Sequence, residues 1–408
     1  MKRHLAILSI ISALAAAPNA AHAQAAFDGT VKVGILNDQS SLYADVTGQG
    51  SVIAARMALE DYMKANPNTK LKVEIIFADH QNKPDIGSNL ARQWYDRDGV
   101  DMILDVPNSA VALAVSEVTK QVNKVHVNGS AGTARLTGDA CSPNTVQWTF
   151  DNFALANGTG RAVVQTGGDT WFFITADYAF GHDLEAQTST IVKAEGGKII
   201  GGVRAPLNTP DFSSFLLQAQ TSKAKVIGLA NAGGDTINSI KQAAEFGIVS
   251  AGQRLAGLLV FVTDVHALGL PIAQGIQFIE AFYWDMNDDT RAWTKRFVEK
   301  MNGKQYPTMN HAGTYGGMLH FLKAIEAAQT RDGVKIVEKM KKLPTEDATF
   351  GKGRVREDGR HIHPMYLWEV KKPAESKAAW DYYKLVKTIP AEQAWRPLDQ
   401  GGCSLVKK

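Results

Sequence analysis

Hydrophobic and polar positions alternate at the start of the mature chain and then return at helical spacing. Val31, Val33 and Ile35 alternate with polar or small residues, which is typical of a short strand. A polar, glycine-bearing stretch (37–51) follows, and hydrophobic residues then recur with the period of a helix. The same order continues, with strands predicted at 71–77, 100–104 and 124–127 and helices at 85–97 and 109–122. Strands that alternate with helices predict parallel pairing and right-handed crossovers.

The second half of the chain repeats this plan. Further strands are predicted at 170–175, 198–203, 226–230, 255–261, 276–284 and 365–370, and further helices at 154–165, 212–220, 290–302, 309–329 and 333–342. Most strands end in a polar or glycine-rich turn. The pattern predicts an α/β fold with two doubly wound parallel-sheet lobes whose strand ends face each other across a cleft.

Hydroxyl and amide side chains follow three strands of the first half. The candidates are Asn37, Ser40 and Ser41, then Asn108 and Ser109, then Ser130 and Thr133. Gathered at one sheet edge, they would form a neutral hydrogen-bonding rim suited to a carboxylate or an amino acid backbone. Helix N-capping uses the same residue types and is the alternative, although the N–H groups beside a cap remain open to an anion. Tyr43 offers a flat surface to a ligand, or is an incidental loop residue.

The first 23 residues have the pattern of a secretory signal peptide. A basic start, Met1–His4, precedes a short apolar run and the cleavage pattern Ala21-His22-Ala23. No cysteine lies near that site, so a lipid anchor is not indicated. The mature protein is expected to begin near Gln24 and to be periplasmic.

Composition indicates an ordinary globular protein with enough chain for two cores. Of 408 residues, 45% are hydrophobic and 21% charged, and the formal charge is +3. No basic block with interleaved aromatic residues indicates nucleic acid binding. Cys141 and Cys403 predict one disulfide in an oxidising compartment, with two unpaired buried thiols as the alternative.

Signatures of enzymes, cofactors and metals are incomplete. The stretch 196–198 lacks the first glycine of a phosphate-binding loop, and 48–50 lacks the third glycine of a dinucleotide fingerprint. No serine stands in Gly-x-Ser-x-Gly. His361 and His363 share one strand face in a basic segment (350–364) that reads as a solvated hairpin, and no third metal ligand follows. We therefore expect a binding protein with no catalytic residue, cofactor or metal.

Four segments together resemble a known family. They are the loop Asn37–Tyr43 before a Gly-x-Gly helix, the turn Asp177–Gly181, the strand Met365–Lys371 and the tail from Trp380 to Cys403. They resemble the type I periplasmic substrate-binding proteins of ABC importers, in the leucine/isoleucine/valine-binding branch. The resemblance implies a monomer that closes on a ligand and docks onto membrane permease subunits.

The resemblance also implies domain limits. It implies hinge crossings near 147–152, 283–287 and 344–353, with lobe 1 formed by 27–146 plus 288–344 and lobe 2 by 150–283 plus 354–400. The implied ligand-binding residues are Tyr43, Asn108, Ser109, Ala131, Thr133, Tyr178, Asn231, Thr263 and Tyr283.

The ligand class stays open at this point. Amino acid binders of this branch have an acidic residue near the position of Thr263, where this chain has threonine with Asp264 next to it. The ligand is therefore expected to be an amino acid or an aromatic acid, such as a benzoate or hydroxycinnamate. Phe180 and Trp284 would help to line a flat pocket or would fill the lobe cores. A ligand-sensing domain for a signalling receptor and a secreted hydrolase are the alternative functions.

Overall fold

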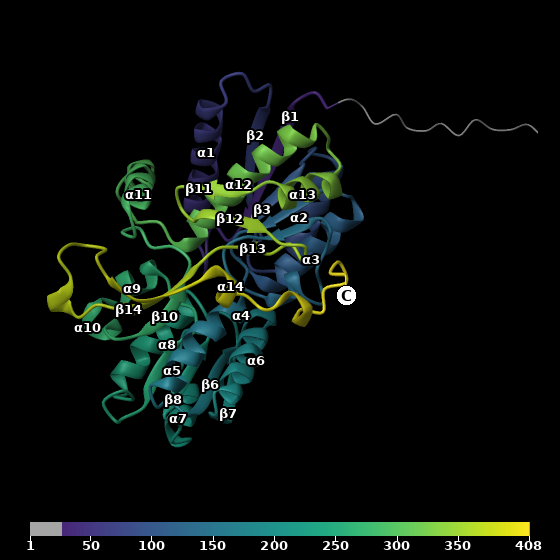
Figure 1. The fold of residues 1–408 in the computed structure, drawn as a ribbon. Helices are drawn as coiled ribbons and strands as arrows, with labels where there is room; N and C mark the ends of the chain where they lie inside the picture. Colours follow the sequence, from purple (N-terminus) through teal and green to yellow (C-terminus); the bar gives the residue numbers. More distant parts are fainter. Residues whose placement is uncertain (1–26, 408) are drawn as a thin grey trace, which may run out of the picture.

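Two halves are visible in the computed structural model, which describes residues 27–407 (Figure 1). The upper half, lobe 1, contains a five-stranded parallel sheet of order β2-β1-β3-β4-β5. The lower half, lobe 2, contains a four-stranded parallel sheet of order β7-β6-β8-β9. The predicted fold class is confirmed, whereas the predicted signal peptide and mature start lie outside the described residues.

The strands and helices have the following bounds. The strands of the two parallel sheets are β1 (Thr30–Asn37), β2 (Lys72–Asp79), β3 (Met102–Asp105), β4 (Val125–Asn128), β5 (Thr145–Gln147), β6 (Thr170–Ala176), β7 (Lys198–Ala205), β8 (Val226–Ala230) and β9 (Arg254–Gly257). Lobe 1 has the helices α1 (Gly48–Ala65), α2 (Pro84–Asp96), α3 (Ser109–Gln121), η1 (Ala134–Thr137), α11 (Asp288–Lys300), α12 (Met309–Ala328) and α13 (Gly333–Lys342). Lobe 2 has α4 (Asn152–Leu155), η2 (Ala156–Gly160), α5 (Arg161–Gln165), α6 (Ala179–Ala194), α7 (Ser213–Thr221), α8 (Gly234–Glu245), α9 (Val262–Leu268) and α10 (Leu270–Ala273).

Buried aliphatic residues explain why β1 lies inside its sheet. Val31, Val33, Ile35 and Leu36 have no exposed surface, and the strand pairs with β2 on one side and β3 on the other. A strand covered by helices on both faces requires such apolar side chains. The carboxyl end of β1 is thereby held beside those of its neighbours, where the polar residues begin.

Two antiparallel sheets complete the fold. One consists of β10 (Gln277–Glu280), β14 (Met365–Val370) and β15 (Tyr383–Ile389), and the other of β11 (Thr345–Asp347), β12 (Gly351–Val355) and β13 (His361–Ile362). The first adjoins β9 in lobe 2, and the second packs against α12 and α13 in lobe 1. Short turns η3 (Pro373–Glu375), α14 (Ala391–Ala394) and η4 (Leu398–Gln400) occupy the C-terminal part.

Between β1 and β15, within the described part of the chain, the backbone passes between the lobes three times. The connections run from β5 to α4, from β10 to α11 and from β13 to β14. The first two coincide with the predicted crossings near 147–152 and 283–287. The segment predicted as the third crossing, 344–353, holds β11 and most of β12, and the chain reaches the lobe 2 sheet only at β14. The residue limits of the two lobes stay a prediction.

The basic segment 350–364 does form a hairpin, and the expectation that it is solvated holds for Lys352 and Arg354 on its first strand but is wrong for its second strand. Arg360, His361 and His363 are at most 1% exposed. The His361 ring stacks on Trp148 with centroids 4.0 Å apart, and its Nε2 lies 2.9 Å from Thr345 Oγ1. Burial lowers the pKa of His363 to about 4. The two histidines are therefore neutral packing residues, and no group of three or more metal-binding side chains occurs within residues 27–407.

Two predicted strands are shorter than expected. The apolar run 255–261 is a strand only as far as Gly257, and the run 276–284 only over β10. Residues 258–261 are at most 3% exposed although they lie outside the ladder. Leu259 and Phe261 line the cavity between the lobes, Val260 packs in the lobe 2 core, and Leu258 N donates to Leu229 O of β8 (3.3 Å). Hydrophobicity alone does not distinguish such packing from strand pairing.

Cys141 and Cys403 form the predicted disulfide, with their Cα atoms 5.6 Å apart. It joins the C-terminal tail to the loop between η1 and β5.

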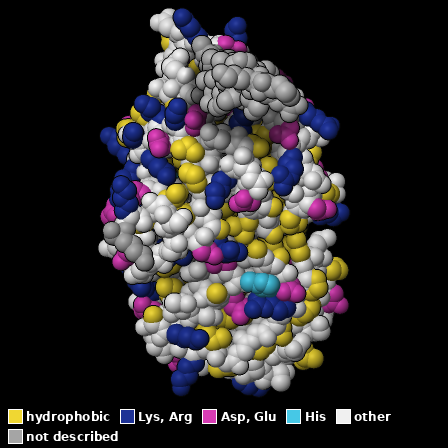
Figure 2. Space-filling view, turned by 90° about the vertical axis from the view of Figure 1, so that its right-hand side faces the viewer, with side chains coloured by type: hydrophobic (Ala, Val, Ile, Leu, Met, Phe, Trp, Pro, Cys, Tyr) yellow, Lys and Arg dark blue, Asp and Glu magenta, His cyan; other side chains and the backbone are white. Residues whose placement is uncertain are grey.

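No helix among residues 27–407 is both long and apolar enough to cross a membrane. On the face drawn in Figure 2, side chains of both charges are interspersed and apolar side chains gather near the middle.

Substitution of the buried Arg360 tests the hinge. Arg360 donates from Nη1 to Phe150 O (2.8 Å) and from Nε to His361 O (3.1 Å), and its guanidinium lies 3.7 Å from Asp151. We expect R360M to lower the free energy of unfolding by about 3–5 kcal/mol, because it leaves a buried carboxylate without its cation. Denaturant unfolding measures this.

Arg291 provides the matched control, since its ion pairs with Asp285 and Asp288 are exposed. R291M is expected to cost less than about 1 kcal/mol. Equal effects of the two substitutions would contradict the role given to Arg360.

Candidate functional site

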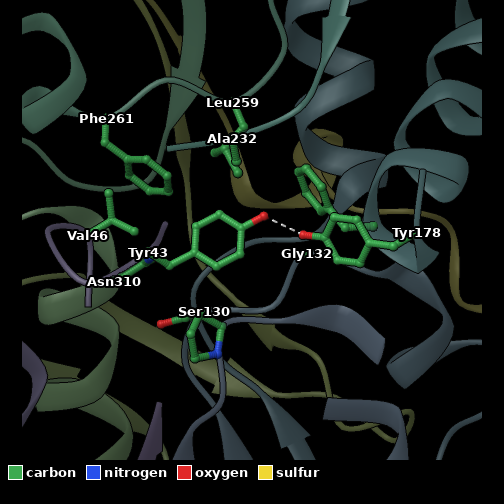
Figure 3. A pocket seen from close by; sticks show the side chains of 11 residues that line it. Tyr43, Val46, Ser130, Gly132, Tyr178, Ala232, Leu259, Phe261 and Asn310 are labelled. Atoms are coloured by element: carbon green, nitrogen blue, oxygen red, sulfur yellow. Dashed lines mark hydrogen bonds between the residues drawn. The ribbon is translucent and has the colours of Figure 1, made fainter. Parts of the chain in front are cut away.

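A small cavity lies where the carboxyl ends of the two parallel sheets face each other (Figure 3). Its lining residues come from both lobes: Tyr43, Val46, Pro107, Ser130, Gly132 and Asn310 from lobe 1, and Tyr178, Phe180, Ala232, Leu259 and Phe261 from lobe 2. The enclosed volume is about 20 Å³, which is space for about one water molecule. None of the lining side chains is charged.

A buried carboxylate positions Tyr43. Asp38, at the end of β1, accepts hydrogen bonds from Tyr43 N (2.8 Å) and from Ser41 N (3.0 Å). Burial acts to raise the pKa of Asp38, but these bonds and one from Asn82 outweigh it and leave the pKa below its ordinary value. The ionised side chain folds the loop so that the Tyr43 ring projects toward lobe 2, as Figure 3 shows.

Tyr43 and Tyr178 meet across the cleft. Their hydroxyl oxygens are 2.6 Å apart (Figure 3). Burial raises the pKa of both phenols, so both stay neutral and one donates to the other. The direct contact fills the space between the strand ends, and a ligand of more than a few atoms must separate the two rings.

Three further contacts show that the cleft is closed. Ala134 N, in lobe 1, donates to Asp183 Oδ2 on α6 (2.8 Å). Tyr306, before α12, stacks on Trp380 of lobe 2 with centroids 5.2 Å apart. Gly233 lies against the Tyr43 loop at φ +58°, and a Cβ there would be 2.7 Å from Leu42 O. Only glycine permits that approach of the lobes.

The predicted lobe 1 residues come together beside the cavity, but most of their side chains bond within the lobe. Asn108 Oδ1 accepts from Ala110 N (3.0 Å) and Val111 N (3.2 Å) and thereby caps α3. Ser109 Oγ accepts from Thr133 N (3.2 Å). Both the predicted capping role and the predicted gathering at one edge are therefore seen. Ala131 is buried there as well, and its carbonyl accepts from Asn128.

The predicted lobe 2 residues are more dispersed. Asn231, which follows β8, bonds to the first turn of α8: its Oδ1 accepts a hydrogen bond from Thr236 Oγ1 (2.9 Å). Thr263, the second residue of α9, has a buried hydroxyl without a partner. Tyr283 lies elsewhere: its hydroxyl donates to Trp380 O (2.7 Å), and its ring stacks on Tyr383 in a hollow beside β14. Of the implied ligand-binding residues, Tyr43 and Tyr178 line the cavity, as do the rim candidate Ser130 and Phe180.

Asn310 is a lining residue that the sequence analysis missed. It is 1% exposed, stands second in α12, and its Oδ1 has no hydrogen-bond partner. Thr308 caps this helix by accepting from His311 N. The Thr-x-x-His start of the helix is visible in the sequence, but its place at the cleft depends on where the chain recrosses between lobes.

Asp264 lies directly behind the lining residue Phe261. Its Oδ2 accepts from Phe261 N (2.9 Å), and the side chain is 1% exposed. Burial raises the pKa of Asp264 to about 8, with Asp45 of lobe 1 adding repulsion, and burial also raises the pKa of the nearby Glu280. Asp264 is therefore a protonated cap in the closed cleft.

Comparisons with known proteins agree with this architecture. The family described as "Periplasmic binding protein" matches residues 30–377. The chain belongs to the periplasmic binding protein family. A crystal structure of a periplasmic binding protein from Burkholderia mallei is 48% identical, has a TM-score of 0.89, and covers 93% of this chain and 100% of its own.

Two named relatives indicate the branch of the family. A branched-chain amino acid ABC transporter periplasmic ligand-binding protein from Burkholderia xenovorans LB400 is 39% identical with a TM-score of 0.80, and the alignment covers 92% of this chain and 99% of that one. Leu/Ile/Val-binding protein homolog 6 of Brucella melitensis is 26% identical over 86% of this chain and 90% of its own. The predicted resemblance is confirmed.

A more distant structure shares the fold alone. A Rhodopseudomonas palustris solute binding protein in complex with 4-hydroxybenzoate is 23% identical, with a TM-score of 0.79 over 90% of this chain and 98% of that one.

Proteins of this family are extracytoplasmic, bind small ligands and deliver them to permeases. The chain is such a binding protein of ABC transporter type and not an enzyme, so the hydrolase alternative is wrong.

The raised pKa of Asp264 predicts a pH dependence of stability. Its folded pKa of about 8 exceeds the ordinary 3.8, so the folded state keeps a proton that the unfolded chain loses. The contribution is complete below pH 4 and declines as the pH rises toward 8, by up to about 1.4 kcal/mol per pH unit. Denaturant unfolding from pH 4 to 8 should show a steeper decline for the natural protein than for D264N.

The exposed Asp289 serves as the control, and D289N should leave the pH profile unchanged. If the free energy of unfolding of D264N had the same pH dependence as that of the natural protein, the raised pKa of Asp264 would be contradicted.

Proposed function

We propose that this protein is the substrate-binding component of an ABC importer, which closes around a small carboxylate and delivers it to permease subunits in the inner membrane. The supporting observation is the cavity between the facing strand ends, because residues of both lobes line it and the hydroxyls of Tyr43 and Tyr178 meet across it. Hinge closure over a ligand is the motion that such an arrangement permits. We further propose a periplasmic monomer.

An aromatic acid, such as a benzoate or a hydroxycinnamate, fits the lining best. Tyr43, Tyr178, Phe180 and Phe261 supply four rings. Stacked or edge-on aromatic pairs contribute about 0.5–1.5 kcal/mol each beyond burial of area. A ligand ring placed between the two tyrosines would replace their mutual contact. The Rhodopseudomonas palustris protein with 4-hydroxybenzoate provides a precedent within this fold.

Backbone groups of lobe 1 are proposed to hold the carboxylate. The N-terminus of α3 begins at Ser109, and the loop 130–134 runs beside it. A helix N-terminus favours an anion. Asn108 Oδ1 already accepts from Ala110 N and Val111 N, so a ligand carboxylate would bind at the Ser109 N–H or displace this cap. We propose that Asn108, Ala131 and Thr133, which adjoin the lining residues Pro107, Ser130 and Gly132, support this corner, and that Asn231 and Thr263 support the lobe 2 side beside Ala232 and Phe261.

An amino acid is the second candidate ligand. The Burkholderia xenovorans and Brucella relatives have names that refer to branched-chain amino acids. In this chain, Asp264 and Asp235 lie near the cavity, and burial raises the pKa of Asp235 to about 6. An ammonium group in the opened cleft would stabilise the ionised form of either carboxylate. Ligand sensing for a receptor remains the alternative to transport.

A ligand panel tests the proposed class. We expect benzoate or 4-hydroxybenzoate to raise the melting temperature, whereas L-leucine and L-phenylalanine do so less. A ligand at 100 times its dissociation constant adds about 2.7 kcal/mol of stability. Thermal-shift assays and calorimetry on the mature protein measure the difference.

The order of response decides between the candidates. Stronger stabilisation by L-leucine than by the benzoates would show that the ligand is an amino acid and not an aromatic acid. No response to any small carboxylate at millimolar concentration would overturn the proposed function.

Asn310 is expected to recognise a hydrogen-bond donor on the ligand. Its buried, unpartnered Oδ1 is an acceptor at the cavity wall. Loss of one such bond costs about 1–1.5 kcal/mol. We expect N310A to weaken 4-hydroxybenzoate binding about tenfold and benzoate binding much less, as measured by calorimetry.

Asn238 gives the control, because it bonds to Thr209 O on the far side of α8 and does not line the cavity. N238A should change neither affinity. If N310A lowered the affinity for both ligands equally, Asn310 would support the cavity wall but would not hydrogen-bond the hydroxyl of 4-hydroxybenzoate.

A further inference from the structure

The C-terminal segment 390–403 returns from lobe 2 to lobe 1. In Figure 1 this yellow part of the chain runs across the middle of the molecule from the lobe 2 strands to the C-terminus. It leaves lobe 2 at β15, which pairs with β14, and reaches the disulfide with Cys141 in lobe 1. The two cysteines are 262 positions apart. The lobes are thus joined by three backbone crossings and by a fourth connection that sulfur closes.

The first part of this segment is anchored to lobe 2 and to the hinge. Gln393 O accepts from Asn157 Nδ2 of lobe 2 (2.8 Å). Trp395 is 4% exposed and donates from Nε1 to His363 O, at the third crossing (2.9 Å). The guanidinium of Arg360 lies 4.3 Å from the centroid of the same indole. The segment therefore has no slack between β15 and the hinge.

The second part is anchored to the loop that borders the ligand cavity. Arg396 Nη2 donates to Ala134 O (3.0 Å), and the disulfide holds Cys141, further along the same loop. The N–H of Ala134 donates to Asp183 of lobe 2 in the closed cleft. Ser130 and Gly132, just before Ala134, line the cavity. One segment thus contacts both lobes and the loop through which they meet.

We propose that residues 390–403, locked by the Cys141–Cys403 disulfide, act as a strap that limits how far the two lobes separate. A chain anchored at both ends can extend by no more than about 3.3–3.6 Å per freed residue. Opening must therefore stop when the strap is taut, or must break its hydrogen bonds one after another. The disulfide withstands that tension, whereas the Arg396–Ala134 bond by itself can exchange with water.

Small-angle X-ray scattering of the ligand-free protein tests the strap. We expect the oxidised natural protein to have a smaller radius of gyration and a shorter maximum dimension than C141S/C403S. Reduction of the natural protein under native conditions should reproduce the larger dimensions, with loss of the disulfide verified by thiol titration. No ligand is needed, so the result is independent of the proposed ligand class.

A second variant keeps the disulfide and lengthens the strap. Insertion of Gly-Ser-Gly-Ser between Gln400 and Gly401 should also enlarge the ligand-free protein, since it lengthens the segment at the end of η4, where Gln400 is exposed. It decides the question even if C141S/C403S fails to fold. As a control for general destabilisation, L216A removes a buried side chain from the lobe 2 core and should lower the melting temperature without changing the scattering dimensions.

Unchanged dimensions in the insertion variant would overturn the proposal. So would unchanged dimensions in folded C141S/C403S with only a lower melting temperature, since the disulfide would then stabilise lobe 1 without restraining the cleft.

Discussion

The buried guanidinium of Arg360 is the interaction on which the arrangement of the lobes depends. A cation without exposed surface requires polar partners, because its hydration is lost. Arg360 finds them in Phe150 O at the first crossing and in His361 O on its own strand, and its planar group faces Trp395 of the tail. Separate connections between the lobes therefore meet at one side chain. These connections are therefore packed together at Arg360 as a single unit.

At the cavity of the closed cleft, the two lobes meet through neutral polar groups, and neither wall of the cavity presents a charged side chain to the other. The two tyrosine hydroxyls that meet across the cleft are neutral, and no charged side chain lines the cavity. The acidic side chains nearby accept hydrogen bonds from backbone N–H groups: the ionised Asp38 shapes the Tyr43 loop, and the protonated Asp264 caps Phe261. This division explains how an acidic neighbourhood can still present an apolar, aromatic surface to a ligand.

Long and strongly periodic segments could be predicted from the sequence to within a few residues. Helix α13, strand β8 and strand β14 have the predicted limits, and α12 differs by one residue. Two apolar runs were over-extended as strands; in one of them, residues 258–261 are buried by side-chain packing in lobe 2 and at the cavity and not by a strand ladder. The hairpin of β12 and β13 was predicted, but its pairing with β11 and the burial of Arg360, His361 and His363 were missed, since that burial depends on Trp148 and Trp395.

The sequence by itself determined the two-lobed α/β class, the polar strand ends and the pairing of the two cysteines as one possibility, because each depends on local periodicity or composition. It also identified Tyr43 and Tyr178. Only the tertiary structure decided that these two rings meet, that Tyr283 lies in another hollow and that Asn310 reaches the cavity. The physical reason is that the cavity is made where segments from opposite ends of the chain converge, and their convergence depends on the hinge and not on the neighbours of each residue.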